Sequence, residues 1–362
     1  MIPDSGTPGH ASRKDEHLNL AVRLHDRDRQ NAFDDVSFIH HALPGTSVDS
    51  TDPGTTVFGA RWEAPFYINA MTGGTRATAE INAGLAGAAA DAGVAIACGS
   101  QHIALRDPGR ADGFRIIRRE APQAFVLANV GPTVTPEDAV RAVEMLEANA
   151  LQIHLNVAQE LVMPEGDRDF RDWPERIAAI VAAVPVPVVA KEVGFGLSRH
   201  TMAMLERAGV AAVDVAGAGG TDFIAIENER RPGRDYSYLT GWGQPAVLCL
   251  LDALWGDEPT GLPVFASGGV RTPLDVVRSL ALGARAVGVS GHFLRTLVRN
   301  GLDGLRRELR TWTDHVRTLM TLLGAAEVGQ LRDTDVLVTG ETAERARLLG
   351  IDPAQLAHRS RR

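Results

Sequence analysis

The sequence is poor in the residues that staple small or exported proteins together. It has only two cysteines, Cys98 and Cys249, and neither belongs to a Cys-x-x-Cys pair or a cysteine/histidine cluster. This excludes a disulfide framework and a zinc site of the usual spacing. No run of about 18 apolar residues occurs, so we expect no transmembrane helix. The first twenty residues lack the apolar segment of a secretory signal and carry the charged run Arg13-Lys14-Asp15-Glu16. We therefore expect a cytoplasmic protein.

Neither sign of charge dominates the chain, and aromatic residues are scarce. Lys and Arg number 37 against 45 Asp and Glu, which gives a net charge of −8, and only 5% of residues are aromatic. A mildly acidic chain is not a general binder of nucleic acid or of membrane surfaces. Glycine is the abundant residue, with 37 copies among 362 residues. A chain of this length buries a large core without metal or disulfide support.

A repeating pattern begins at residue 65. Short continuous runs of Val, Ile and Ala alternate with helical stretches, and continuous apolar runs are typical of strands buried on both faces of a parallel sheet. Two helical stretches open with a Thr-Pro capping pair, at Thr135-Pro136 and Thr272-Pro273. The predicted strands cover residues 65–70, 94–98, 125–130, 151–156, 186–192, 212–216, 263–266 and 286–289.

Eight such strands alternating with helices predict an α/β fold, a (β/α)8 TIM barrel, with an N-terminal extension and C-terminal helices. An open doubly wound sheet is the alternative. We expect an N-terminal segment over 1–59, with 1–12 disordered and a helix over 14–28, a barrel over 60–300 and a helical tail over 301–362. Residues 217–262 are expected to form an inserted loop and a helix.

Reactive residues of such a barrel lie at the carboxyl ends of its strands. Ser267-Gly268-Gly269 followed by Arg271, together with Ser290-Gly291, stands after the last two strands. Glycine-rich turns that lead into helices direct backbone N–H groups toward a bound anion, which predicts a phosphate cradle. Ordinary tight turns are the simpler interpretation.

Two strand ends carry further polar groups. Lys191 ends an apolar strand and cannot be buried unpaired, so it either pairs with an acid such as Glu192 or places a positive charge beside an electron-rich cofactor ring. His154 and Asn156 share one strand face, and Gln159 and Glu160 follow. Glu160 offers an oxygen ligand for Mg²⁺, with substrate phosphate completing the shell. His154 taken alone is more typical of a core histidine.

Near the N-terminus, Arg13-Lys14 belongs to a short charge run. Such a run is usually a solvated helix face, but a basic pair that folds over the barrel mouth would bind a diphosphate. The adjacent pair His40-His41 points in different directions and is no metal site by itself.

Several of these segments together resemble one family, the FMN-dependent type 2 isopentenyl-diphosphate isomerases. The resemblance runs from about Arg13 to about Arg295. It rests on the segments Arg13-Lys14-Asp15-Glu16-His17, Phe33-Asp34-Asp35-Val36, Ala70-Met71-Thr72-Gly73-Gly74, His154 to Glu160, Lys191-Glu192-Val193-Gly194, Gly219-Gly220-Thr221 and Ser267 to Arg271.

The resemblance implies a role for each matching residue. The substrate would be bound by Arg13, Lys14, Ser100, His102, His154, Asn156 and Gln159, and Glu160 would ligate Mg²⁺. FMN would be held by Met71, Thr72, Gly73, Ser100, Asn129, Lys191, Thr221, Gly268, Gly269, Arg271, Ser290 and Gly291. Ala216 stands where the family often has serine, which implies the loss of one hydrogen bond to FMN. His102 stands where the family often has arginine or another residue, and its contact with the diphosphate would depend on protonation near neutral pH.

The implied reaction interconverts isopentenyl diphosphate and dimethylallyl diphosphate by a 1,3-proton shift with no net redox change. Reduced FMN would be the acid–base group and NADPH its reductant, with Gln159, His154 and Lys191 as positioning and electrostatic groups. A homo-oligomer, a tetramer or octamer, is expected. The alternatives are an FMN-dependent 2-hydroxy-acid oxidase or dehydrogenase, which needs a histidine that residues 217–222 lack, and a non-catalytic flavin-binding barrel.

Overall fold

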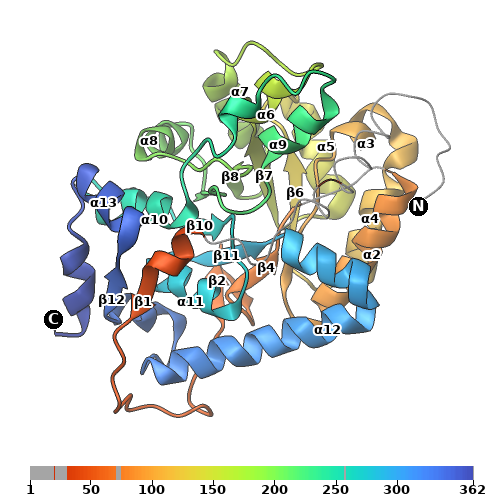
Figure 1. Ribbon diagram of the computed structural model, residues 1–362. Helices are drawn as coiled ribbons and strands as arrows, with labels where there is room; N and C mark the ends of the chain where they lie inside the picture. Colours follow the sequence, from red (N-terminus) through yellow and green to blue (C-terminus); the bar gives the residue numbers. More distant parts are fainter. Residues whose placement is uncertain (1–19, 21–30, 71–74, 257, 362) are drawn as a thin grey trace.

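Eight parallel strands close into a barrel at the centre of the molecule (Figure 1). The computed structural model describes residues 20, 31–70, 75–256 and 258–361. The predicted TIM barrel is confirmed and the open sheet is wrong, because β11 pairs with β4 and closes the circle, with Val287 opposite Phe66. The barrel strands, in order, are β4 (Phe66–Ile68), β5 (Ala95–Ala97), β6 (Val126–Val130), β7 (Ala150–Leu155), β8 (Val188–Glu192), β9 (Ala212–Asp214), β10 (Val264–Ser267) and β11 (Ala286–Val289).

Helices surround the barrel, and several begin where the sequence predicts a cap. The side chain of Thr135 accepts a hydrogen bond from the backbone N–H of Asp138, and Thr272 accepts one from Asp275. The helices that accompany the strands are α2 (Arg76–Ala92), α3 (His102–Arg106), α4 (Asp112–Glu120), α5 (Pro136–Leu146), α6 (Val157–Val162), α7 (Trp173–Ala183), α8 (Arg199–Arg207), α9 (Phe223–Arg230), α10 (Ala246–Trp255), α11 (Pro273–Ala281) and α12 (Gly291–Leu322).

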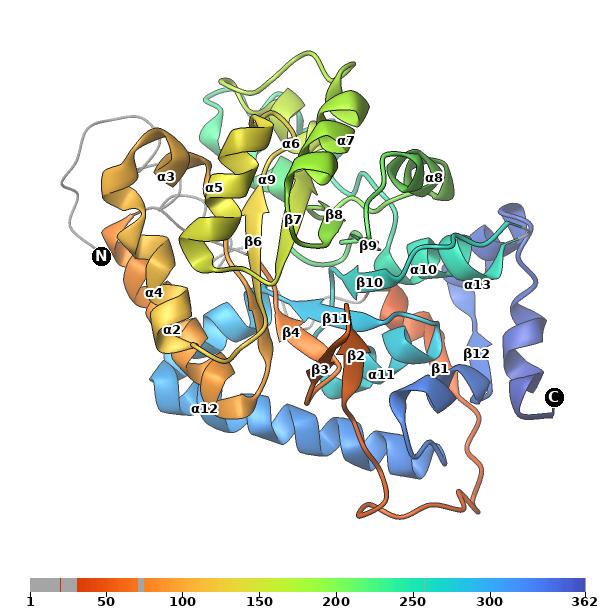
Figure 2. The same ribbon diagram turned by 180° about the vertical axis from the view of Figure 1, so that it is seen from behind.

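The amino-terminal end of the barrel is closed by a hairpin of β2 (Thr55–Val57) and β3 (Ala60–Trp62), which Figure 2 shows beside β4 and β11. The indole of Trp62 packs on Phe125 and Tyr67, with ring centroids 5.2 and 5.7 Å apart. Burial of large aromatic rings stabilises this end of the barrel. The opposite end, where the strands terminate, is left for a site.

The tail beyond residue 300 is not helical throughout, so that prediction is wrong in part. Strand β12 (Val336–Val338) pairs antiparallel with β1 (Val36–Phe38). Val336 and Val338 are buried while Leu337 is exposed, which is the alternation of a half-buried strand. The tail also contains α13 (Gly340–Leu348) and the 3₁₀ helices η4 (Val328–Asp333) and η5 (Pro353–Arg361).

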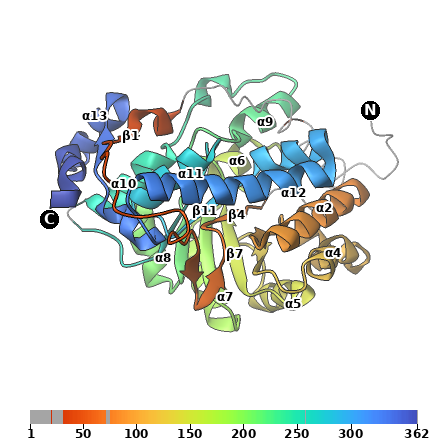
Figure 3. The ribbon, with the colours of Figure 1, turned by 90° about the horizontal axis from the view of Figure 1, so that it is seen from below.

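Helix α12 runs along one side of the barrel and packs on α2 and α11 (Figure 3). It is bent at Gly301, whose φ of 68° interrupts the helix. The expected boundary between barrel and tail, at 300/301, therefore falls on this bend. Among the described helices, none combines the length and apolar character needed to cross a bilayer.

Two further predictions concern the insertion after β9 and the N-terminal residues. The insertion over 217–262 holds two α-helices, α9 and α10, and the 3₁₀ helix η3 (Ser237–Leu239), where we expected a single helix. The predicted helix over 14–28 and the predicted disorder over 1–12 lie outside the described residues, apart from residue 20.

Candidate active site

An open cavity lies at the carboxyl ends of the strands, with about 1100 Å³ of empty space that is partly continuous with solvent. This is the end of a TIM barrel at which substrates bind. Its walls come from turns after most of the barrel strands, so residues far apart in the sequence meet there. The predicted site residues on its walls are Ser100, Asn129, His154, Gln159, Lys191, Thr221, Gly268, Gly269, Arg271, Ser290 and Gly291.

One wall has the backbone features of the predicted anion site. Gly268 and Gly269 have φ angles of 91° and 78°, in the left-handed region, and a side chain on Gly268 would collide with the carbonyl of Gly217. Next to this turn, helix α12 begins after Ser290, whose side chain makes no capping hydrogen bond. The first N–H groups of α12 thus keep their capacity to bind a phosphate, supported by the helix dipole.

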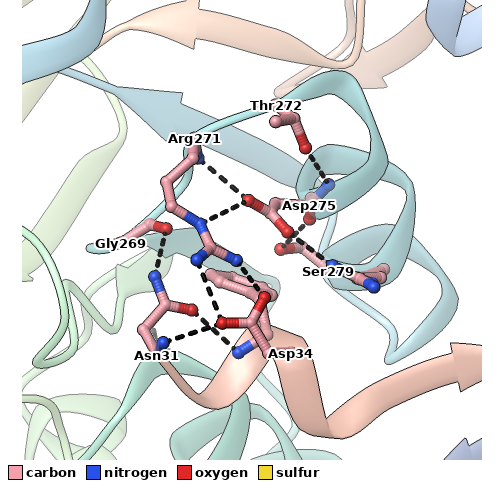
Figure 4. Close-up of polar contacts among 9 residues, drawn as sticks. Asn31, Asp34, Gly269, Arg271, Thr272, Asp275 and Ser279 are labelled. Atoms are coloured by element: carbon pink, nitrogen blue, oxygen red, sulfur yellow. Dashed lines mark hydrogen bonds and ion pairs between the residues drawn. The ribbon is translucent and has the colours of Figure 1, made fainter. Parts of the chain in front are cut away.

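Arg271, on the same wall, is held between two carboxylates (Figure 4). Its guanidinium donates to both oxygens of Asp34, at 2.6 and 3.0 Å, and its backbone N–H and Nε donate to Asp275. The hydrogen bonds with Asp34 raise the pKa of Arg271, and the same pairing lowers the pKa of Asp34. Asn31 adds a hydrogen bond to the carbonyl of Gly269 at 2.9 Å, so the segment before β1 braces the glycine turn.

A lysine at the end of β8 also lines the cavity. Lys191 is only 7% exposed, and its Nζ donates to the backbone carbonyl of Glu192 at 2.6 Å. The carboxylate of Glu192 instead accepts from the backbone N–H groups of Val193 and Phe195, both at 2.6 Å. Burial raises the pKa of Glu192 to about 7. The buried Lys191 ammonium group therefore donates to a neutral backbone carbonyl, at the edge of the cavity.

Next to this lysine, β7 and α6 supply an imidazole and an amide. His154 lies opposite Lys191 in the strand register, and its Nδ1 is 2.9 Å from Asn129 Oδ1. Gln159 donates from Nε2 to Glu227 Oε1 at 2.8 Å. Glu227 is fully buried and also accepts from Arg230; although burial lowers the pKa of this arginine, its hydrogen bond and charge pairing with Glu227 raise it.

Glu160 follows Gln159 and faces a different set of groups. Its Oε1 accepts from Asn156 Nδ2 at 2.7 Å, and its Oε2 accepts from the backbone N–H of Asp167 at 2.8 Å. Within the described ranges, no three His, Cys, Asp or Glu side chains gather closely enough to hold a metal ion. A cation at Glu160 would need its other oxygen ligands from substrate or water.

Comparison with known proteins identifies the family. The model of the FMN-dependent dehydrogenase family matches residues 23–159 and 110–338. An isopentenyl-diphosphate delta-isomerase of Nocardia farcinica is 53% identical over 351 residues, which cover 97% of this chain and 96% of that protein. The enzyme of the same name from Listeria welshimeri is 44% identical, over 96% of this chain and 97% of that protein. The chain belongs to the FMN-dependent isopentenyl-diphosphate delta-isomerases.

Membership in this family makes the chain an isomerase and a flavoprotein, and the predicted family resemblance is confirmed. Solved structures support the fold alone. Mandelate oxidase with benzoyl-formic acid is similar with a TM-score of 0.60 over 89% of this chain and 90% of that one, at 21% identity. An isomerase and an oxidase thus share one barrel, and their difference must lie in the site.

Not every predicted site residue lies on the cavity wall. Among the described residues, the lining leaves out His102, Asn156 and Glu160. His102 begins α3, Asn156 precedes α6, and Glu160 lies within α6. Arg13, Lys14, Met71, Thr72 and Gly73 lie outside the described residues. Ala216, where the family often has serine, does line the cavity, and its φ of 35° is unusual for a residue with a side chain.

The sequence interpretation missed three buried polar residues beneath or beside the cavity. They are Glu227, which holds Gln159, and Gln152 and Asp214, which lie inside the barrel at 0% exposure. A signal for two of them was present. Gln152 and Asp214 interrupt strands that are otherwise apolar, and burying a polar side chain is costly unless it is hydrogen-bonded. Such interruptions predict a polar network.

Proposed function

We propose that the chain interconverts isopentenyl diphosphate and dimethylallyl diphosphate in this cavity, with reduced FMN as cofactor. The observation that carries the proposal is the division of the cavity. The glycine turn and the start of α12 offer a place for an anion, while Lys191, His154 and Gln159 line the cavity at β8, β7 and α6. This arrangement accommodates a phosphorylated cofactor and leaves polar groups for a second, phosphorylated ligand.

The residues present fit FMN. The left-handed glycines at 268 and 269 and the uncapped start of α12 suit its phosphate, and the buried ammonium of Lys191 suits the electron-rich ring. When bound, reduced FMN supplies the acid–base chemistry of the proton shift, and NADPH is its proposed reductant. Arg271 braces the turn through its ion pairs with Asp34 and Asp275. Its proposed contact with the cofactor depends on the positive charge that these two carboxylates do not neutralise.

The protein side chains bind and orient. His154 and Gln159 would position the substrate against the cofactor, and Gln159 is held in place by the buried carboxylate of Glu227. Glu160 would ligate Mg²⁺ together with substrate diphosphate oxygens, with Asn156 steering the carboxylate. Arg13, Lys14, Ser100 and His102 are the proposed partners of the diphosphate. Homo-oligomerisation and a cytoplasmic location stay predictions.

A 2-hydroxy-acid oxidase is the competing function, because the barrel resembles mandelate oxidase. Such an enzyme needs a histidine base after β9, where this chain has Gly217 to Asp222 without a histidine. In that part of the chain the structure instead places α9, whose Glu227 is bound to Gln159 and Arg230. The isomerase therefore fits the site better.

One assay tests the proposal. Purified protein is incubated without oxygen with FMN, Mg²⁺, NADPH and isopentenyl diphosphate. Dimethylallyl diphosphate is expected to accumulate in large excess over the NADPH consumed, since the flavin is reduced once and then reused. Product formed in one-to-one proportion with NADPH, or no product at all, would contradict the proposal.

A further inference from the structure

A continuous chain of hydrogen bonds crosses the barrel interior beneath the cavity. Asn69 Nδ2 donates to Asp214 Oδ2 at 2.9 Å, and Gln152 Nε2 donates to Asn69 Oδ1 at 3.3 Å. Asn129 Nδ2 donates to Gln152 Oε1 at 3.1 Å, and the chain ends at His154 Nδ1, 2.9 Å from Asn129 Oδ1. Its first four members are at most 2% exposed. Water cannot replace their partners, so the direction of each bond is fixed within the protein.

The chain is anchored at Asp214, a group that only accepts hydrogen bonds when ionised. Its carboxylate also accepts from the hydroxyls of Tyr67 and Ser267, at 2.8 and 2.7 Å. Burial, together with the charge of Asp214, keeps the pKa of Tyr67 well above its ordinary value, so this hydroxyl stays a donor. The next member, Asn69, must therefore turn its Nδ2 toward Asp214.

A second group fixes the same amide from its other side. The backbone N–H of Ala70, which can only donate, lies 2.8 Å from Asn69 Oδ1. Glycine at 288 makes room for this side chain, because a Cβ there would collide with Asn69 Nδ2 and crowd Tyr67. Asn69 therefore has a single orientation, in which its oxygen faces Gln152.

Each following amide has only one choice left. Gln152 must direct Nε2 to the oxygen of Asn69, so its Oε1 receives Nδ2 of Asn129. Asn129 then presents Oδ1 to the imidazole of His154. An amide oxygen cannot donate, so the proton of that last hydrogen bond belongs to His154 Nδ1.

We propose that Gln152, acting through Asn129, sets the tautomer of His154, with the proton on Nδ1 and the lone pair on Nε2. Gln152 is a positioning residue, because it is fully buried and reaches the cavity only through its neighbours. The neutral ring then offers Nε2 as an acceptor, and it becomes a donor there only when the ring is protonated. The tautomer assignment is independent of the proposed function. Only the identity of the ligand that His154 would contact rests on that function.

The tautomer itself can be observed, without turnover. Holoenzyme labelled with ¹⁵N-histidine is studied by solid-state NMR at a pH where the ring is neutral, and the His154 signals are assigned by their loss in His154→Gln. The expected wild-type pattern is a protonated Nδ1 and an unprotonated Nε2. A wild-type signal from protonated Nε2 overturns the proposal, whatever the isomerase assay shows.

Two variants of one residue supply the matched comparison. Gln152→Met removes the acceptor from Asn129, which is then free to turn its Nδ2 toward His154, so protonated Nε2 is expected to appear. Gln152→Glu keeps an oxygen toward Asn129 in either protonation state, so the wild-type pattern is expected to persist. Flavin content and thermal midpoints verify that both variants fold.

Each outcome decides the matter. An unchanged pattern in Gln152→Met, or a lost one in Gln152→Glu, refutes the role of Gln152. If Gln152→Met does not fold, the wild-type spectrum still tests the tautomer, and loss of the pattern in Gln152→Glu still refutes the role of Gln152. Absence of isomerase activity with the expected spectra would reject the proposed function and leave the tautomer assignment standing.

Discussion

Arg271 and Asp34 form a two-pronged ion pair across 237 positions of sequence, with N–O distances of 2.6 and 3.0 Å. The pair joins the segment before β1 to the glycine turn that is proposed to bind the cofactor phosphate. The arginine side chain is 15% exposed and the carboxylate 41%. A planar guanidinium matches two carboxylate oxygens, which lysine does not. Attachment of the N-terminal segment and the shape of the cofactor turn are therefore coupled.

A double-mutant cycle of Asp34→Ala and Arg271→Ala should detect this coupling. We expect an interaction free energy of roughly 0.5–2 kcal/mol at pH 7, because the pair is bidentate but partly exposed to solvent. The measurement is urea unfolding of the wild type, both single variants and the double variant. Because the native pKa of Asp34 is lowered, the pair stabilises the fold above the ordinary pKa of the carboxyl, and this contribution is lost as pH falls through the native value. Strict additivity at pH 7 would show that the pair contributes nothing.

Glu192 should make stability fall as the solution becomes more alkaline. Its native pKa is raised from 4.5 to about 7 by burial, so between these values the folded protein holds a proton that the unfolded chain releases. Stability attributable to this group is present at pH 4.5 and lost as pH rises through 7, by at most about 3 kcal/mol.

The variant Glu192→Gln is expected to remove that loss. The glutamine oxygen can still accept the backbone N–H groups of Val193 and Phe195, which share one oxygen in the wild type. The free energy of unfolding, measured at pH 5, 6, 7 and 8, should therefore fall less steeply for the variant. Glu175→Gln, on the exposed surface of α7, is the control and should keep the wild-type slope. Parallel slopes for all three proteins would contradict the prediction.

Gly288 is expected to tolerate no side chain. A Cβ at this position would collide with Asn69 Nδ2 and lie 3.0 Å from Tyr67 Cζ, two buried members of the barrel interior. Gly288→Ala should lower the free energy of unfolding by roughly 1–3 kcal/mol, as overpacking does. The matched control is Gly87→Ala in α2, where a Cβ meets nothing within 4 Å. It should instead stabilise the protein by roughly 0.5–1 kcal/mol, because alanine favours a helix.

Glu160→Gln should separate metal dependence from flavin binding. Glu160 is not among the residues that line the cavity and is bound to Asn156 and to the backbone of Asp167, so its loss should not remove the cofactor. We expect unchanged FMN content, read from the flavin absorbance, and a loss of the activation by Mg²⁺ in the isomerase assay. Glu137→Gln, on the exposed face of α5, is the control. Full Mg²⁺ activation of Glu160→Gln would remove this residue from the metal site.

Much of the architecture follows from local chemistry that the sequence displays. Continuous apolar runs such as 286–289 must be buried on both faces, and Thr-Pro pairs such as Thr272-Pro273 can begin a helix but not continue a strand. These signals act over a few residues, so they can be recognised in the sequence without knowledge of the fold. The glycine turn at 268–269 can also be recognised in the sequence, because a turn with positive φ angles excludes most residues other than glycine. The barrel and its strands were therefore predicted correctly, and the anion site stays a prediction.

Pairings between distant residues were decided only by the tertiary structure. No residue near Arg271 in the sequence indicates that it pairs with Asp34. Likewise, Val336 to Val338 form a strand because they pair with the edge of β1. Closure of the barrel brings Asn69, Gln152 and Asp214 within hydrogen-bond distance, and there the cost of burying each polar group forces a partner upon it. Local sterics and burial act along the chain, and the sequence therefore indicated the barrel strands and the turns that follow them. The tertiary structure alone determined which polar groups meet, because hydrogen bonding acts through space.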